Sequence, residues 1–364
     1  MSIDPRPQDY SRRKILKLAG LAASTAAISV ACKATTSSSP SPQAGAIAAT
    51  PHTNPASDPS ASTPGVSRVV LIRSEDRVAG MRQALDLLQP QGLQAQTVFL
   101  KPNYNTADPA PAATDTPLLE ALIQDLQNAG SGQITIGDRS GMANTRQAME
   151  SKGVFALADR YGLKALVLDE LDRQDWQYFP AAGTHWSQGF AVARPALQAG
   201  AIVNTCCLKT HRYGGHFTLA LKNTVGLVAK FVPGDPHNYM GELHSSPYQR
   251  QMIAEINQAY TPALVLLDGV EAFVNGGPDR GDRVKAGVML AGTDRVAVDV
   301  VALGILRLLG TTAAVAQGSV WDLEQIQRAV ELGLGVASPE QIEIMTADGA
   351  GQKMADEIRP LIAI

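Results

Sequence analysis

The chain has 364 residues, 45% of them hydrophobic and 18% charged, and its formal net charge is −3 at pH 7. These values are ordinary for a globular protein that is long enough to bury a large core. Non-specific nucleic-acid binding needs basic side chains that neutralise phosphates, so the negative charge argues against a nucleic-acid partner and favours a small molecule. The 3 cysteines are too few for a disulfide framework.

Residues 1–32 have the features of an export signal. Arg12 and Arg13 stand in a Ser-Arg-Arg-x-x-x-Lys frame, and the weakly apolar segment that follows, residues 18–31, is too short for an ordinary membrane-spanning helix. This arrangement resembles a twin-arginine signal; a basic amphipathic helix is the alternative. The resemblance implies the twin-arginine translocation machinery as a partner, and a location across the cytoplasmic membrane that is either periplasmic or membrane-anchored.

Cys32 ends a Ser-Val-Ala-Cys sequence that resembles a lipoprotein processing box, in which the cysteine becomes a lipidated N-terminus. Lipidation would provide a membrane tether, whereas simple cleavage or an uncleaved anchor would leave Cys32 unmodified. Residues 33–65 consist mostly of Ser, Thr, Ala and Pro with almost no charge, a composition that cannot bury enough surface to offset its ordering entropy. It predicts a disordered linker, and the folded domain is expected over residues 66–364.

Hydrophobic periodicity predicts strands that alternate with helices in this domain. The expected strands cover residues 69–72, 98–100, 134–136, 165–168, 201–203, 263–267 and 288–291. The expected helices cover residues 77–88, 116–130, 145–161, 248–260 and 296–309, with another beginning near His216 and a tail, residues 320–345, of helix, connector and short edge strand. This order is typical of a three-layer α/β domain with a largely parallel sheet.

Polar residues follow several of these strands directly. The clusters are Lys101 with Asn103, Asp138 with Ser140, Lys209 with Thr210 and His211, and Asp268 with Glu271. Because parallel strands share their direction, the clusters are expected to converge at one edge of the sheet, where α/β proteins bind ligands. A turn or helix cap is the alternative for any single cluster.

Several short motifs resemble the domain of unknown function 362 family. They are Lys101-Pro102-Asn103, Gly137 to Gly141, Leu208-Lys209-Thr210-His211 with Ala220-Leu221-Lys222-Asn223 and Gly226, Asp268-Gly269 with Gly276-Gly277-Pro278 and Gly281, and Asp294 to Asp299. The similarity covers roughly residues 69–309, and the Lys-Thr-His and Lys-Asn motifs are its most specific part. The resemblance supplies little chemistry, because the family has no generally established reaction.

The sequence departs from the family pattern in two places. Members often carry Pro-Lys where this chain has Cys206 and Cys207. Many members also carry ferredoxin-like cysteine runs, and this chain has none. Two thiols in the folded part cannot supply four cysteine ligands, so no iron–sulfur cluster is expected.

The first site hypothesis is a cationic pocket for a small anion, either a carboxylate or a phosphate. Its charged residues would be Lys101, Lys209 and Lys222, and the residues that orient the anion would be Asn103, Thr210 and Asn223. Solvated surface lysines are the alternative.

The second site hypothesis is a divalent or other transition metal. The candidate ligands are His211, His216, His237, His244, Cys206 and Cys207, with Asp138 or Asp268 as additions. The spacing matches no zinc motif, and adjacent cysteines point to opposite sides of a strand. The alternative makes the histidines hydrogen-bonding loop residues and the cysteines core residues.

Two aspartates near the end of the matched region carry separate expectations. Asp294 is placed to cap the helix that follows it, and Asp299 on an apolar segment needs a buried partner, for which Lys209 or Lys222 would serve.

Three functions remain open from the sequence. An enzyme would use His211 as general acid or base with Asp138 or Asp268 as its partner, acting on a small anionic substrate with or without a divalent metal. A non-catalytic periplasmic metabolite- or metal-binding lipoprotein would use the same pocket without turnover. The third possibility is structural: the loops pack against one another and have no further function. A strongly perturbed His211 beside a carboxylate would favour catalysis, and a pocket of lysines and amides without such a pair would favour binding.

Overall fold

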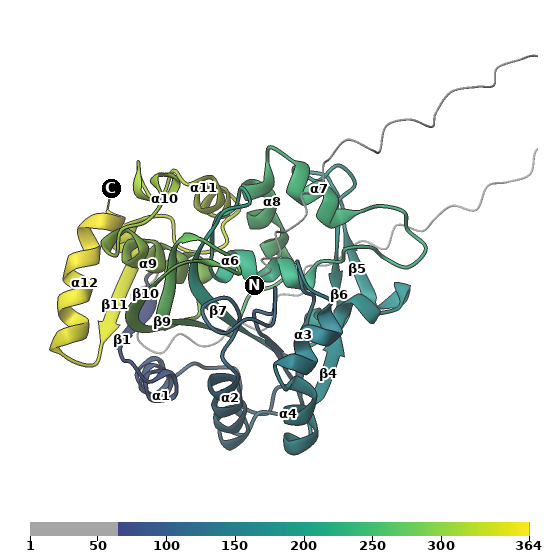
Figure 1. The fold of residues 1–364 in the computed structure, drawn as a ribbon, viewed down its shortest axis with the longest axis horizontal. Coiled ribbons are helices and arrows are strands. Elements are labelled where there is room, and N and C mark those ends of the chain that lie inside the picture. The colour runs from purple at the N-terminus through teal and green to yellow at the C-terminus, as the bar shows by residue number, and fades with distance from the viewer. Residues whose placement is uncertain (1–64, 364) are drawn as a thin grey trace, which may run out of the picture. The chain divides into compact units, whose positions relative to one another are not determined.

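The computed structural model describes residues 65–363. The predicted export signal, Cys32 and all but the last residue of the predicted linker lie outside these residues. The described part forms an α/β fold around a nine-stranded sheet with the strand order β11-β1-β10-β9-β7-β2-β3-β4, to which β8 is added beside β7 (Figure 1). Among the described helices, none is both long enough and apolar enough to cross a membrane.

The sheet is mixed and mostly parallel. Its strands are β1 (Ser67–Arg73), β2 (Val98–Lys101), β3 (Ile134–Asp138), β4 (Lys164–Val167), β7 (Ala201–His211), β8 (His216–Thr218), β9 (Leu264–Gly276), β10 (Gly281–Gly292) and β11 (Ile342–Thr346). Neighbours from β9 through β7, β2 and β3 to β4 are parallel, as are β1 and β11, whereas β10 is antiparallel to both β1 and β9. A separate antiparallel pair is formed by β5 (Trp176–Phe179) and β6 (Phe190–Ala193).

Helices cover both faces of the sheet. They are α1 (Arg77–Leu88), α2 (Thr116–Asn128), α3 (Thr145–Ser151), α4 (Val154–Tyr161), α5 (Arg194–Leu197), α6 (Ala220–Asn223), α7 (Tyr239–Ser245), α8 (Gln249–Glu255), α9 (Arg295–Leu308), α10 (Ala313–Ala316), α11 (Glu324–Glu331) and α12 (Gly349–Ile362). Figure 1 shows α1, α2 and α4 on one side of the sheet and α9, α10 and α11 on the other.

The period of two along the strands explains these layers, because successive side chains point to opposite faces of a sheet. On β1, Val69 and Leu71 belong to the buried cluster formed with α9 and α12, while Val70 and Ile72 belong to the cluster formed with α1, α2 and α4. Each central strand is therefore buried on both faces, as its nearly continuous apolar sequence indicates. The predicted three-layer α/β class is confirmed.

The segment after Val203 differs from the prediction. The expected order was a short strand, a polar loop and a helix near His216, whereas β7 continues to His211 with every residue buried. The strand tolerates its polar residues because they are hydrogen-bonded: Asn204 Nδ2 donates to Ala220 O at 3.1 Å, and Thr210 Oγ1 donates to Phe273 O at 3.2 Å. His216 begins β8 instead, and the helix starts only at Ala220.

The predicted role of Asp294 is confirmed, and the predicted partner of Asp299 is corrected. Asp294 caps α9, accepting hydrogen bonds from Val296 N at 2.8 Å and Ala297 N at 3.0 Å. Asp299 pairs with neither predicted lysine: its carboxylate accepts from Ala220 N at 2.7 Å and Leu221 N at 3.0 Å, at the start of α6. Burial raises the pKa of Asp299 to about 7, against the opposing effect of these two hydrogen bonds. This contact fixes the beginning of the short helix that carries Lys222.

Candidate functional site

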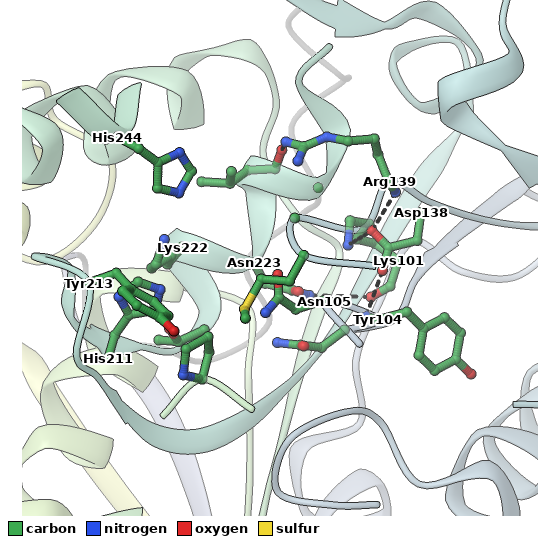
Figure 2. A pocket seen from close by; sticks show the side chains of 17 residues that line it. Lys101, Tyr104, Asn105, Asp138, Arg139, His211, Tyr213, Lys222, Asn223 and His244 are labelled. Carbon is green, nitrogen blue, oxygen red and sulfur yellow. Dashed lines mark hydrogen bonds and ion pairs between the residues drawn. The ribbon is translucent and has the colours of Figure 1, made fainter. Parts of the chain in front are cut away.

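A pocket of about 600 Å³, measured out to its open mouth, lies where several strands and short helices end. Its lining includes Lys101 from the end of β2, Asp138 from the end of β3, His211 from the end of β7, Lys222 from α6 and His244 from α7. Figure 2 shows Lys101, Asp138 and Arg139 facing Lys222, His211 and His244 from the other side of the pocket. Three of the four predicted polar clusters therefore contribute residues to one pocket.

A buried ion pair forms one wall of the pocket. Lys101 Nζ lies 2.7 Å from Asp138 Oδ1, and Asp138 also accepts hydrogen bonds from Tyr104 N and Arg139 N, each at 2.7 Å (Figure 2). The pKa of Lys101 is lowered by burial, and the attraction of Asp138 opposes this shift. Asp138 was predicted to assist His211, but its oxygens already serve the lysine and two backbone amides.

Gly226 makes this ion pair sterically possible. A Cβ atom at this position would lie 2.4 Å from Asp138 Oδ1 and 2.6 Å from Lys101 Nζ. Both distances are far below any normal contact, so only glycine lets the chain pass so close to the two charged atoms. The glycine that follows the Lys-Asn motif is thus explained by the pair that it touches.

Lys222 carries the unpaired charge of the pocket. Its side chain is 7% exposed, and within residues 65–363 its ammonium makes no hydrogen bond or ion pair with a protein group and is accessible from the pocket. The pKa of Lys222 is lowered to about 8, mainly by burial and further by the charges of Arg139 and Lys209. A mostly buried side chain whose charged group has no protein partner and opens to the pocket is the strongest candidate for contact with an anion.

The histidines beside Lys222 are held in the neutral form. Burial lowers the pKa of His211 well below its ordinary value, and the charge of Lys222 lowers it further. Burial also lowers the pKa of His244, whose Nδ1 lies 2.7 Å from Met240 O. A Cβ atom on Gly215 would lie 3.0 Å from His211 Nδ1 and 3.1 Å from Lys222 Cε, so this glycine lets both side chains enter the pocket.

Several buried polar atoms of the lining have no hydrogen-bond partner in the described part of the chain. They include His211 Nδ1, Asn105 Nδ2 and Thr218 Oγ1. Buried polar atoms in folded proteins are nearly always hydrogen-bonded, so unpaired atoms gathered around one hollow indicate that a solvent molecule or a ligand completes them. Asn105 and Thr218 were not singled out from the sequence.

Arg139 adds a third positive charge to those of Lys101 and Lys222. Its Nε donates to Val228 O at 2.9 Å, and its Nη2 donates to Val225 O and contacts Met240 Sδ. Burial lowers the pKa of Arg139 to about 10, so the guanidinium stays charged at neutral pH. Of the side chains that line the pocket, Lys101, Arg139 and Lys222 are basic and Asp138 is acidic, which leaves an excess of positive charge.

Of the three residues predicted to orient the anion, two line the pocket and are held in place by the protein. Asn103 accepts a hydrogen bond at Oδ1 from Lys209 Nζ at 3.3 Å. Asn223 Nδ2 donates to Asn204 Oδ1 at 2.5 Å and to Thr205 O at 2.9 Å. Both side chains are therefore fixed within a buried network that joins β2, β7 and α6.

Lys209 and Thr210 do not line the pocket, which corrects their predicted role. Besides Asn103, Lys209 Nζ donates to Ala112 O at 2.5 Å and Pro278 O at 3.2 Å. These acceptors use all three N–H groups of the ammonium. Lys209 therefore supports Asn103 from behind and adds positive potential, and Thr210 binds the backbone of β9.

Asp268 also lies elsewhere. Its Oδ2 accepts from Arg77 Nε at 2.8 Å and its Oδ1 accepts from Val270 N at 3.0 Å. It faces α1 and is absent from the lining of the pocket. The expected partnership between Asp268 and His211 is therefore wrong.

The six predicted metal ligands are not assembled. Within residues 65–363, no group of three or more His, Cys, Asp or Glu side chains is placed to hold a metal ion. Cys206 and Cys207 are buried, and His237 Nε2 lies 2.8 Å from Glu242 Oε2. Of the six predicted ligands, only His211 and His244 line the pocket, and His216 lies outside it. A divalent metal stays a prediction of the sequence alone.

Fold and site together define an α/β protein with a cationic pocket at the carboxyl end of a mostly parallel sheet. The chain belongs to the family described as Domain of unknown function (DUF362), whose model matches residues 98–304. This range contains all the residues that line the pocket. The family resemblance of the sequence motifs is confirmed.

The chain is also similar to individual proteins. The thylakoid-associated protein sll1697 of Synechocystis sp. is 27% identical over 252 residues, which make up 67% of this chain and 75% of that protein. The lactate racemase apoprotein of Thermoanaerobacterium thermosaccharolyticum superposes with a TM-score of 0.40 and 15% identity, covering 63% of this chain and 55% of the racemase chain.

Proposed function

We propose that the protein binds a small anionic molecule, a carboxylate or a phosphate, in the pocket between β2, β3, β7 and α6. The observation that carries this proposal is the ammonium of the mostly buried Lys222, which has no protein partner among the described residues and opens to a hollow with an excess of positive charge. An anion there would restore the electrostatic balance and occupy unpaired donors such as Asn105 Nδ2 and Thr218 Oγ1.

Binding without turnover fits this geometry better than acid–base catalysis by His211. General acid–base residues are commonly oriented by a second polar group, and His211 Nδ1 has no hydrogen-bond partner within residues 65–363. The two carboxylates proposed to orient it are bound elsewhere, Asp138 to Lys101 and Asp268 to Arg77. A pocket of lysines and amides that lacks a histidine–carboxylate pair favours binding over catalysis.

A second candidate function is proton transfer by Lys222 itself. Its pKa of about 8 leaves a fraction of the amine neutral near physiological pH, as a general base requires. Incubation with a bound carboxylic acid in deuterated water would test this candidate. Deuterium incorporation next to the carboxylate, lost in Lys222→Arg, would favour the enzyme, and no incorporation would leave binding alone.

The test of binding is the pH dependence of anion affinity. The ammonium form of Lys222 predominates below its pKa of about 8 and is lost as the pH rises through that value, so the affinity for anions should fall in the same window. Well above pH 8, the loss should approach about tenfold per pH unit, as expected for one required proton. Sulfate and acetate serve as probes, because neither changes its charge between pH 6.5 and 9.5. Calorimetric titrations that show equal affinity across this range would contradict the role of Lys222.

We further propose that binding takes place outside the cytoplasm, for capture or delivery of a metabolite. The paired arginines at positions 12 and 13 and the cysteine at position 32 support this location. Fractionation of cells should place the protein in the periplasm or on the membrane, and a double Arg12→Lys, Arg13→Lys variant should be retained in the cytoplasm. Cytoplasmic wild-type protein would overturn the proposal about location without affecting the pocket.

A further inference from the structure

Two large apolar side chains stand at the rim of the cationic pocket. Tyr213 is 48% exposed and Met142 is 49% exposed, and both line the same hollow as Lys101 and Lys222, which are 1% and 7% exposed. The pocket therefore changes in character along its depth, from buried charge in the interior to exposed apolar surface at the mouth. Exposed apolar side chains that gather at a hollow indicate a binding surface.

Tyr213 is held in place although half of it is exposed. Arg212 Nη2 donates to Tyr213 Oη at 2.8 Å, and the guanidinium carbon of Arg212 lies 4.6 Å from the centre of the tyrosine ring. Arg212 is anchored to the turn between β9 and β10 through Asp279 Oδ1 and Arg280 O, each at 2.8 Å. The ring is thus oriented before any ligand arrives, which reduces the entropy cost of stacking against it.

Tyr213 also lies directly beside the charged interior. Its ring centre is 5.8 Å from that of His211 in an edge-on arrangement, and Figure 2 shows both rings on the same side of the pocket as Lys222. A ligand whose anionic group meets Lys222 therefore has the exposed ring of Tyr213 within the same pocket. Val225 and Pro278 add further apolar surface to the lining.

We infer that the ligand is an anion joined to a planar apolar ring, with the anionic group at Lys222 and the ring against Tyr213 and Met142. The inference rests on the proposed anion binding and adds the chemistry of the rest of the ligand. Aromatic rings gain from stacking on one another and from contact with a thioether sulfur, so both rim residues favour the same kind of group. Simple anions such as acetate would occupy only the interior.

The test compares acetate with benzoate, which have the same charge and differ by the ring. Wild-type protein should bind benzoate about tenfold more tightly than acetate in calorimetric titrations at pH 7, within the range expected for one aromatic contact with its buried area. Tyr213→Ala should reduce this ratio to roughly two or less, and Tyr213→Phe, which keeps the ring, should restore most of it. Tyr178→Ala is the matched control, because Tyr178 is 53% exposed on β5 and does not line the pocket.

The outcomes separate this inference from the proposed function. Equal affinity of wild-type protein for acetate and benzoate overturns the inference and leaves anion binding intact, whereas binding of none of acetate, benzoate and sulfate overturns the proposed function. An undiminished benzoate preference in Tyr213→Ala, or an equal loss in Tyr178→Ala, also overturns the inference. If Tyr213→Ala does not fold in a thermal melt, Met142→Ala takes its place, with a smaller expected reduction of about threefold from the loss of one sulfur contact.

Discussion

Lys222→Met is expected to weaken sulfate binding by about a hundredfold and, at the same time, to stabilise the ligand-free protein. A charge-assisted contact contributes up to about 3 kcal/mol, which corresponds to this loss of affinity. In the absence of ligand, the ammonium sits on a mostly buried side chain, has no partner among the described residues and is disfavoured by desolvation. Replacing it with an apolar side chain of similar length should raise the free energy of unfolding by on the order of 1–3 kcal/mol.

Urea unfolding without ligand and calorimetric titration with sulfate measure the two effects of Lys222→Met independently. Lys164→Met is the control, because Lys164 is an exposed lysine on β4 and should change neither quantity by much. Opposite signs for stability and affinity distinguish a ligand-binding lysine from one that only supports the fold. A Lys222→Met protein that is less stable and still binds sulfate would refute the assignment.

Asp138→Ala should have the largest effect on stability, a loss of about 3–5 kcal/mol in the free energy of unfolding. The substitution leaves the Lys101 ammonium buried without its carboxylate and removes the acceptor for Tyr104 N and Arg139 N. Adding Lys101→Met removes the stranded charge as well. The double variant should therefore lose less stability than the sum of the two single variants.

Equilibrium urea unfolding of the four proteins in this cycle gives the coupling energy between Lys101 and Asp138. Asp115→Ala provides a reference for a carboxylate whose hydrogen bond caps a helix, because Asp115 accepts from Leu118 N at the start of α2. That variant should lose about 1 kcal/mol. If Asp138→Ala costs no more than Asp115→Ala, the buried pair does not have the structural role described above.

The layered fold could be predicted from the sequence because strands and helices are indicated by local patterns of apolar residues. Strands buried on both faces appear as short apolar runs, as in β1 and β9, and helices such as α1 and α9 show apolar residues at helical spacing. The end of a strand is less visible where polar residues continue it. Along β7 the polar residues are buried because remote groups, such as Ala220 O for Asn204, accept their hydrogen bonds, and no local pattern reveals such partners.

The position of the pocket could be predicted from the sequence, but the residues that line it could be predicted only in part. Asp138 and Asp268 each follow a short apolar run in the sequence, yet Asp138 ends β3 and meets Lys101 at the pocket, whereas Asp268 lies within β9 and meets Arg77 on α1. Side-chain direction and the neighbouring element decide between these environments, and both depend on the tertiary structure. Lys222 could be found through its motif, whereas Tyr213 is one exposed aromatic among several and becomes notable only beside the pocket.

The adjacent cysteines have a further consequence for how the protein matures. Cys206 and Cys207 are both buried, and burial raises the pKa of Cys206 well above its ordinary value and that of Cys207 to about 12. Thiol–disulfide exchange and oxidation proceed through the thiolate, which is scarce for both groups at neutral pH. Once folded, residues 65–363 should therefore acquire no cross-link in an oxidising compartment and need no reductant in a reducing one.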